Sequence, residues 1–156
     1  MNEIIKGMAN ASEAIQENFE EQGEKITAHM AESVYFYKTV SRNLGTAGTQ
    51  VVDGFPFIPE LLLIDVISVG TRKISFGKSF KDGQDYAIYK IQDLCWSRQN
   101  GEAIRIYEDS TRITTGKVTI NNNGTINILW EFAAAEGATG NAAVHITAIG
   151  HRRGSD

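Results

Sequence analysis

The sequence has one cysteine, Cys95, and no long run of apolar residues. A single cysteine excludes an internal disulfide framework and a metal site built from several cysteines, and we expect Cys95 to be a packed thiol. No apolar stretch approaches the roughly 20 residues that a membrane-spanning helix needs, and the N-terminus lacks the apolar segment of a secretory signal. We therefore expect neither membrane insertion nor a signal peptide.

Clusters of positive charge are also missing. The chain has 15 Lys and Arg against 19 Asp and Glu, a formal net charge of −4. Residues 1–32 hold seven Glu against Lys6 and Lys25, which is −5, so residues 33–156 carry +1. An acidic head followed by a nearly neutral body without a basic cluster argues against nucleic-acid binding.

Catalytic motifs are absent as well. The sequence contains no GxSxG, no HExxH and no phosphate-binding glycine loop. His29, His145 and His151 are scattered, and we expect His145 to be a strand residue with satisfied hydrogen bonds. Glu108 and Asp109 are adjacent, which suits neither a metal cage nor an acid–base pair. These patterns predict a protein that is not an enzyme and that has no metal or cofactor.

The head, residues 1–33, predicts a helix from about Asn10 to about Glu32. Asn10 followed by Glu13 resembles a capping box. A narrow stripe with alternating spacings of four and three is typical of a coiled-coil seam. We expect the helix to associate with copies of itself; the alternative is a surface helix packed on its own domain. The expected seam residues are Ile15, Phe19, Gln22, Ile26 and His29.

The body, residues 34–153, changes to a period of two. Runs rich in β-branched and aromatic residues alternate with Gly, Asn and Asp, and Asn123-Gly124 is a strong hairpin signal. Trp130 shares a face with Ile128 and is expected in the core. The pattern predicts a mainly β fold, an antiparallel β-sandwich or a jelly roll. The expected strands are SVYFYKTVSR, ELLLIDVISV, RKISFGKSF, DYAIYKI, AIRIY, GKVTI, TINILWEF and AAVHITAIG.

One expected strand, ELLLIDVISV at residues 60–69, is apolar on both faces. Leu61 and Leu63 fall on one face, and Leu62 and Ile64 fall on the other. Because a small antiparallel sandwich covers only one face of each sheet, the second face needs another covering surface. A neighbouring subunit is one candidate, so we expect Leu61 and Leu63 to take part in oligomerisation.

Several segments resemble the tail-fibre or receptor-binding proteins of bacteriophages and prophages. They are ASEAIQENFEEQ, GFPFIPELLLIDVISVG, SFGKSFKDGQDYAIY, GKVTINNNGTINILW and AVHITAIG. The first is similar to a short helical opening segment, and the others are similar to a C-terminal β-sandwich. These motifs cover nearly the whole chain and are structural rather than catalytic. The resemblance implies a homotrimer in the virion, with three helices as a stalk and three sandwiches at its end.

Two irregular stretches, QDLCWSRQNGE and AAAEGATGN, are the expected ligand-binding loops. An aromatic surface beside hydrogen-bonding groups is the combination that binds sugars, and the first stretch offers it. The alternative is that Trp96 fills the end of the sandwich and Arg98 is solvated. Arg105 and Tyr107 should border the same surface or a subunit contact. The candidate ligand residues are Trp96, Arg98, Gln99, Asn100, Arg105 and Tyr107.

The expected function is host attachment without catalysis. A trimeric tail-fibre or baseplate tip would contact other virion proteins and bind a host cell-wall carbohydrate. The alternative is a purely architectural trimer, for example a head decoration or baseplate connector, that recognises only virion proteins. A polysaccharide-degrading enzyme is disfavoured, because the chain is short and has no paired carboxylates at workable positions.

Overall fold

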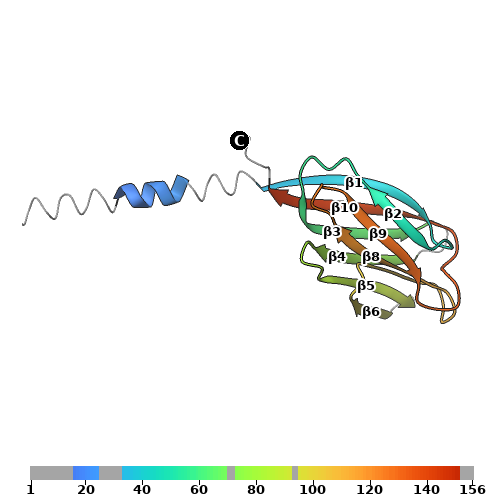
Figure 1. The fold of residues 1–156 in the computed structure, drawn as a ribbon. Helices are drawn as coiled ribbons and strands as arrows, with labels where there is room; N and C mark the ends of the chain where they lie inside the picture. Colours follow the sequence, from blue (N-terminus) through green and yellow to red (C-terminus); the bar gives the residue numbers. More distant parts are fainter. Residues whose placement is uncertain (1–15, 25–32, 70–72, 93–94, 152–156) are drawn as a thin grey trace, which may run out of the picture. The chain divides into compact units, whose positions relative to one another are not determined.

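The computed structural model describes residues 16–24, 33–69, 73–92 and 95–151 (Figure 1). The chain separates into two compact units, Met1–Ser33 and Val34–Asp156. In the first unit, residues 16–24 form a helix in which Phe19 is 71% exposed and Gln22 is also exposed. The other expected seam residues, Ile15, Ile26 and His29, lie outside the described residues. The coiled coil and the trimer therefore stay predictions.

The second unit is mainly β, as predicted, and its strands form two antiparallel sheets (Figure 1). The large sheet has six strands in the order β1-β10-β3-β4-β5-β6, and the small sheet has four in the order β2-β9-β8-β7. The strands of the large sheet are β1 Ser33–Asn43, β10 Asn141–His151, β3 Pro59–Ser68, β4 Ile74–Phe80, β5 Asp85–Gln92 and β6 Cys95–Asn100. Those of the small sheet are β2 Gly48–Val52, β9 Ile126–Phe132, β8 Ile113–Ile120 and β7 Ile104–Tyr107.

All the expected strands are present, and two further strands were missed. β2 reads GTQVV, and β6 reads CWSRQN, so neither shows the alternation of apolar and polar residues that predicts a strand. Both lie at the edge of a sheet. An edge strand can remain exposed to solvent and need not carry an apolar face, which is why its sequence gives a weak signal.

Two meanders form part of the sandwich, and crossover connections place β10 beside β3 and β2 beside β9. β3 to β6 follow one another within the large sheet, and β7 to β9 do so within the small sheet. Because neighbouring strands are antiparallel, alternate connections gather at the same end. The β2–β3, β4–β5, β6–β7 and β8–β9 connections lie where β1 begins and β10 ends, which we call the N-terminal end of the sandwich (Figure 1).

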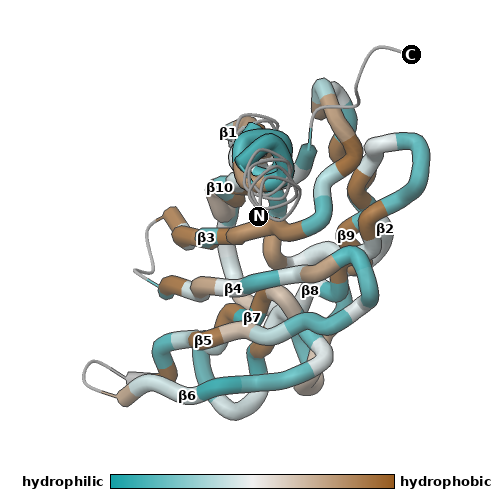
Figure 2. The backbone as a smooth tube through the Cα atoms, turned by 90° about the vertical axis from the view of Figure 1, so that its left-hand side faces the viewer, coloured by the Kyte–Doolittle hydropathy of each residue, from teal (hydrophilic) through white to brown (hydrophobic). Residues whose placement is uncertain are grey.

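The core lies between the two sheets and is formed by alternate residues of each strand. Leu62, Ile64 and Val66 of β3 are fully buried, and they share one cluster with Ile128 and Trp130 of β9. Each such side chain contributes about 1.5–3 kcal/mol through its removal from water. Figure 2 shows β3 as hydrophobic along much of its length. The prediction that Trp130 belongs to the core is confirmed; its indole N–H donates to the Gln50 amide oxygen at 3.1 Å.

Gly77 of β4 marks the closest approach of the large sheet to the β6–β7 connection. A Cβ atom at this position would lie 1.6 Å from the backbone oxygen of Ala103 and 2.7 Å from its carbonyl carbon. Backbone atoms cannot rotate away as the end of a side chain can. Only glycine therefore allows β4 to pass beneath Ala103, which is itself fully buried.

Replacing Gly77 with alanine should destabilise the sandwich strongly. We expect Gly77→Ala to lower the free energy of unfolding by at least about 2 kcal/mol, because the added methyl forces the backbone of the β6–β7 connection outward. Urea unfolding followed by circular dichroism measures the change. Gly45→Ala is the control, since its Cβ would meet only Asn43 Oδ1 at 3.4 Å and Ala138 O at 3.9 Å. Equal stability of the two variants would contradict the predicted clash.

Candidate functional site

The stretch around Trp96, which was expected to be a loop at the end of the sandwich, is the edge strand β6. This expectation was wrong because β6 pairs with β5 through its backbone although its side chains are mostly polar. Gln99 lies opposite the fully buried Ala87 and therefore points toward the space between the sheets. Trp96, Arg98 and Asn100 alternate with Gln99, so they share the outer face of the large sheet.

Arg98 and Asn100 line a pocket of about 430 Å³ at the N-terminal end of the sandwich. The guanidinium carbon of Arg98 lies 5.0 Å from the centre of the Tyr86 ring, and Lys78 Nζ lies 5.9 Å from it. The pocket thus combines an aromatic ring, a guanidinium and amide groups. Its remaining lining residues are Phe80, Gly83, Gln84, Asp85, Tyr86 and Gly101.

Sequence reasoning missed the part of this pocket that comes from the β4–β5 turn. Gln84, Asp85 and Tyr86 belong to KDGQDY, whose glycine and aspartate indicated a turn and nothing more. The turn reaches β6 because β4, β5 and β6 are neighbours in the large sheet. No local signal identified these residues, because β6 itself was not recognised as a strand.

Asp85 links the pocket to the small sheet. Its Oδ2 accepts a hydrogen bond from the Val118 N–H of β8 at 3.1 Å, and its backbone oxygen accepts one from the Gly101 N–H at 2.8 Å. Burial raises the pKa of the Asp85 carboxyl above its ordinary value of 3.8, while hydrogen bonds from the Ser79 side chain and the Val118 N–H act in the opposite direction. The carboxyl thus retains a proton to higher pH than an exposed aspartate does.

The structure does not bring Arg105 and Tyr107 to the Trp96 surface. Both lie on β7 of the small sheet. Arg105 forms an ion pair with Glu102 at 2.9 Å and lies 5.4 Å from the ring of Tyr89, a buried residue of β5. The Arg105 backbone N–H also donates to Ser75 Oγ at 3.0 Å. Arg105 therefore connects the small sheet to the inner side of the large sheet, whereas Trp96 lies on its outer side.

Trp96 is half exposed and stacks on Phe76 of β4, with their ring centres 5.9 Å apart. It does not fill the end of the sandwich, and it is not among the residues that line the pocket of Arg98. The neighbouring Cys95 is exposed, so the expectation of a packed thiol was wrong. The position of Trp96 makes it part of a flat surface rather than of a cavity.

The second expected binding loop, residues 133–141, is held by hydrogen bonds to Glu108 and Thr114. The Thr139 N–H donates to Glu108 Oε2 at 2.6 Å, and its hydroxyl donates to Glu108 Oε1 at 2.9 Å. The Ala138 N–H donates to Thr114 Oγ1 at 2.8 Å, and that hydroxyl donates in turn to the Leu44 carbonyl at 2.7 Å. These polar groups are used for internal structure, which leaves them poorly suited to ligand binding.

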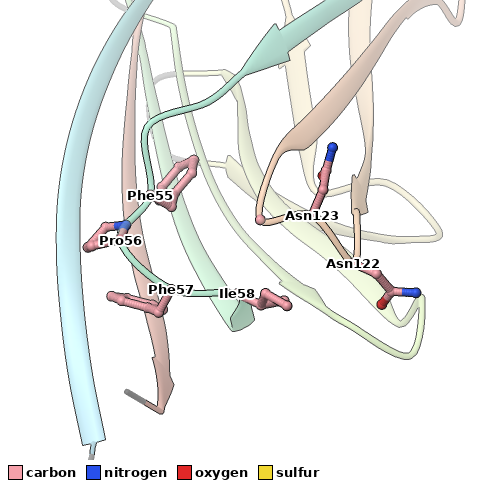
Figure 3. A pocket seen from close by; sticks show the side chains of 7 residues that line it. Phe55, Pro56, Phe57, Ile58, Asn122 and Asn123 are labelled. Carbon is pink, nitrogen blue, oxygen red and sulfur yellow. The ribbon is translucent and has the colours of Figure 1, made fainter. Parts of the chain in front are cut away.

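A second pocket, of about 300 Å³, lies between the β2–β3 loop and the β8–β9 turn (Figure 3). Phe55, Pro56, Phe57 and Ile58 form its apolar side, and residues 122–124 form the other. The Asn123 carboxamide oxygen is already engaged, because it accepts hydrogen bonds from the Thr125 N–H and hydroxyl at 3.0 and 2.8 Å. This pocket offers a ligand fewer polar partners than the pocket of Arg98 does.

The outward residues of β3 and β10 include two of the expected oligomerisation residues. Leu61 and Leu63 are partly exposed and point away from the core, in register with Ile149 and Thr147 of β10. On the same face the prediction for His145 is confirmed, because its Nδ1 lies 2.9 Å from both the Tyr37 and the Thr39 hydroxyl oxygens.

Among residues 16–24, 33–69, 73–92 and 95–151, no three His, Cys, Asp or Glu side chains gather closely enough to hold a metal ion. Within the same residues, no helix has the length and apolar character to cross a membrane. Comparisons with protein-family models, curated proteins and solved structures found no match.

The raised pKa of Asp85 predicts a pH-dependent stability. The folded protein binds this proton more tightly than the unfolded chain, so the aspartate's contribution to stability falls as the pH rises from 3.8 through the folded-state pKa. Asn at this position keeps an oxygen for the Val118 N–H and cannot ionise. We therefore expect the unfolding free energy of Asp85→Asn, relative to wild type, to increase through this window, as measured by urea unfolding at a series of pH values.

Asp109→Asn provides a control of opposite sign. Hydrogen bonds from the Thr111 side chain and backbone lower the pKa of Asp109, and the nearby Arg112 charge acts in the same direction. The wild-type carboxylate therefore gains stability as the pH rises through its titration, and Asp109→Asn should become less stable relative to wild type. A pH-independent difference for Asp85→Asn would contradict the burial of its charge.

Proposed function

We propose that this protein is a non-enzymatic structural component of a phage or prophage particle, a homotrimer that binds a host cell-surface glycan. The observation that carries the glycan proposal is the pocket of Arg98, because two of the predicted ligand residues line one cavity with an aromatic ring. The resemblance of the sequence to tail-fibre and receptor-binding proteins supports the virion assignment and the trimer. The absence of a catalytic motif from the sequence supports the assignment as a binding protein.

The pocket has the chemical groups that sugar binding needs. Arg98 and Asn100 on β6 and Gln84 on the adjoining turn are exposed, so a guanidinium and two carboxamides can reach the hydroxyls of a ligand. Tyr86 and Phe80 supply apolar area for the face of a sugar ring. A volume of about 430 Å³ lies within the usual range of small-ligand sites, about 300–1,000 Å³, and accommodates a short segment of polysaccharide.

A purely architectural role is the second candidate, and the position of the pockets favours it. Both pockets lie at the N-terminal end of the sandwich, the end at which β1 follows the head in sequence. A tip at the end of a stalk would present the opposite end to a host. A pocket near the start of β1 therefore also suits a connection to another virion protein, as a baseplate or head component would need.

The trimer is tested by the molar mass in solution. We expect light scattering on the full chain to give a mass near three times the 17.2 kDa of the monomer. The physical reason is the narrow apolar stripe in the sequence of the head, whose spacing is typical of a coiled-coil seam. A mass of one chain at micromolar concentration would remove the proposed homotrimer.

Glycan binding is tested with variants of the pocket. We expect Arg98→Ala and Asn100→Ala each to weaken binding to purified bacterial wall polysaccharides by about 10- to 100-fold, because each removes a hydrogen bond to the ligand. Calorimetry against a panel of wall polymers measures the affinity. Lys117→Ala is the control, since Lys117 lies on β8 of the small sheet and pairs with Glu131. Failure of a trimeric wild type to bind any polymer would favour the architectural candidate.

A further inference from the structure

The outer face of the large sheet carries an apolar surface that extends over several strands. The register of the strands places its side chains in rows that run across the sheet. One row contains His145, Asp65, Phe76, Ile88 and Arg98, contributed in that order by β10, β3, β4, β5 and β6. The row on one side contains Ala143, Ile67 and Ile74. On the other side the next row contains Thr147, Leu63, Lys78, Tyr86 and Asn100, and Ile149, Leu61 and Phe80 lie in the row beyond it.

The apolar members of this surface are unusually open to solvent. Ile67 is 44% exposed, Phe76 is 43% exposed, and Ile88 is 40% exposed. Trp96 is 50% exposed and extends the surface to the sheet edge by stacking on Phe76. Single exposed apolar residues are ordinary, but a contiguous group of aliphatic and aromatic side chains on a flat sheet marks a contact surface.

The outer face of the small sheet shows what a solvated face of this protein looks like. Leu129 of β9 is 40% exposed, as Ile88 is, but its neighbours are polar. Lys117 lies directly opposite Leu129 on β8 and forms an ion pair with Glu131 at 2.9 Å. Thr119 and Asn127, a further cross-strand pair, continue this face. The two outer faces therefore differ in chemistry although the sheets form one sandwich.

We propose that the outer face of the large sheet binds a second copy of this chain, with β3 of one copy against β6 of the other. The order of charges along the central row identifies the occupant. Asp65 lies toward one side of the row and Arg98 lies at the other, with Phe76 and Ile88 between them. Consider a second copy related by a two-fold axis that runs parallel to the strands, between β4 and β5. Arg98 of the second copy then meets Asp65 of the first, and Ile88 of the second copy meets Phe76 of the first.

The size of the face suits such a contact. With β3 of each copy against β6 of the other, four strands of each copy overlap. At about 4.8 Å for each strand and about seven residues of 3.3 Å each, they cover roughly 450 Å² of flat area. A standard protein interface buries about 800 Å² of accessible surface on each partner. Side chains make the accessible area larger than the flat area, so the contact approaches that size. Phe76 and Ile88 lie at its centre, and Asp65, Lys78, Lys90 and Arg98 lie around them.

This assignment gives Trp96 a role other than the predicted one. Trp96 becomes a contact between copies. Arg98 is shared, because it meets Asp65 in the contact and also lines the pocket with Asn100 and the β4–β5 turn. The contact is two-fold, so it is separate from the contacts within a trimer, whose subunits meet through two different surfaces. It adds to the proposed self-association and does not depend on the head, on glycan binding or on the virion assignment. It extends the contact predicted for Leu61 and Leu63 across the sheet to β6.

Tryptophan fluorescence of the full chain tests the proposal directly. The protein has two tryptophans, and Trp130 is fully buried, so acrylamide quenching reports on Trp96. We expect Trp96 to be shielded at concentrations where light scattering shows an oligomer and to become accessible on dilution to the monomer. Ile88→Glu should make Trp96 accessible at all these concentrations and weaken self-association at least about tenfold, because a charge then enters an apolar contact.

Leu129→Glu is a matched control for Ile88→Glu. The two wild-type residues have the same exposure, 40%. Each also lies opposite a cation on the neighbouring strand, Arg98 for Ile88 and Lys117 for Leu129. Leu129→Glu should leave both the mass and the quenching unchanged. Circular dichroism checks that both variants are folded.

Four results would overturn the proposal. An oligomer in which Trp96 is as accessible as in the diluted protein would mean that the copies associate elsewhere, for instance through the head. Shielding that persists in the monomer would mean that another segment of the same chain covers the face. Equal effects of Ile88→Glu and Leu129→Glu on self-association would mean that the added charge weakens it from the outer face of either sheet. A mass of three chains at every concentration would leave the proposed trimer in place and overturn this contact, because a two-fold contact doubles the number of chains.

A charge exchange tests the orientation. Asp65→Arg and Arg98→Asp should each weaken self-association, because each places like charges opposite one another in the contact. The double variant should recover most of the wild-type affinity, since it restores the pairing with its signs reversed. If the double variant is weaker than either single variant, the contact of β3 with β6 is wrong.

Discussion

The sandwich covers only one face of β3, whose side chains are apolar on both. Leu62, Ile64 and Val66 fill the space between the sheets, and this burial holds β9 and β10 in place around them. Among the described residues of the unit that contains both sheets, no second layer covers the opposite face of the strand. A strand at the centre of a sheet cannot turn its outer residues inward without exposing the inner ones, because a shift of one residue exchanges the faces. The apolar outer surface therefore follows from the same alternation that builds the core.

The two candidate binding surfaces are adjacent but chemically different. The pocket of Arg98 lies at the N-terminal end of the sandwich and is lined by amides, a guanidinium and the Tyr86 ring. The flat surface around Phe76 and Trp96 is apolar. Concave polar sites suit a small hydroxylated ligand, whereas a flat apolar face suits a protein surface of matching shape. Arg98 borders both, so self-association and ligand binding through these two surfaces would be coupled at this residue.

Much of the fold was predictable because each central strand has to bury one face. Alternation located the expected strands, and Asn123-Gly124 located the hairpin between β8 and β9, where Gly124 adopts a positive φ of 86°. β2 and β6 were not predicted, because an edge strand is stabilised mainly by backbone pairing, which does not require an alternating pattern of side chains. Because β6 was not recognised as a strand, the predicted ligand residues include members of two separate sites. Arg98 and Asn100 line one pocket, and Arg105 closes the gap between the sheets by its contact with Tyr89.

The sequence by itself determined the class of the fold, the core face of each central strand and the existence of a second apolar face on β3, since all three depend on residues that are close in the chain. Tertiary structure alone decided which strands are neighbours. That pairing brought the β4–β5 turn to β6, buried the Asp85 carboxyl against Val118, and joined Phe76, Ile88 and Trp96 into one surface. Neighbours in a sheet are selected by the summed fit of all strands, and no local pattern carries that information.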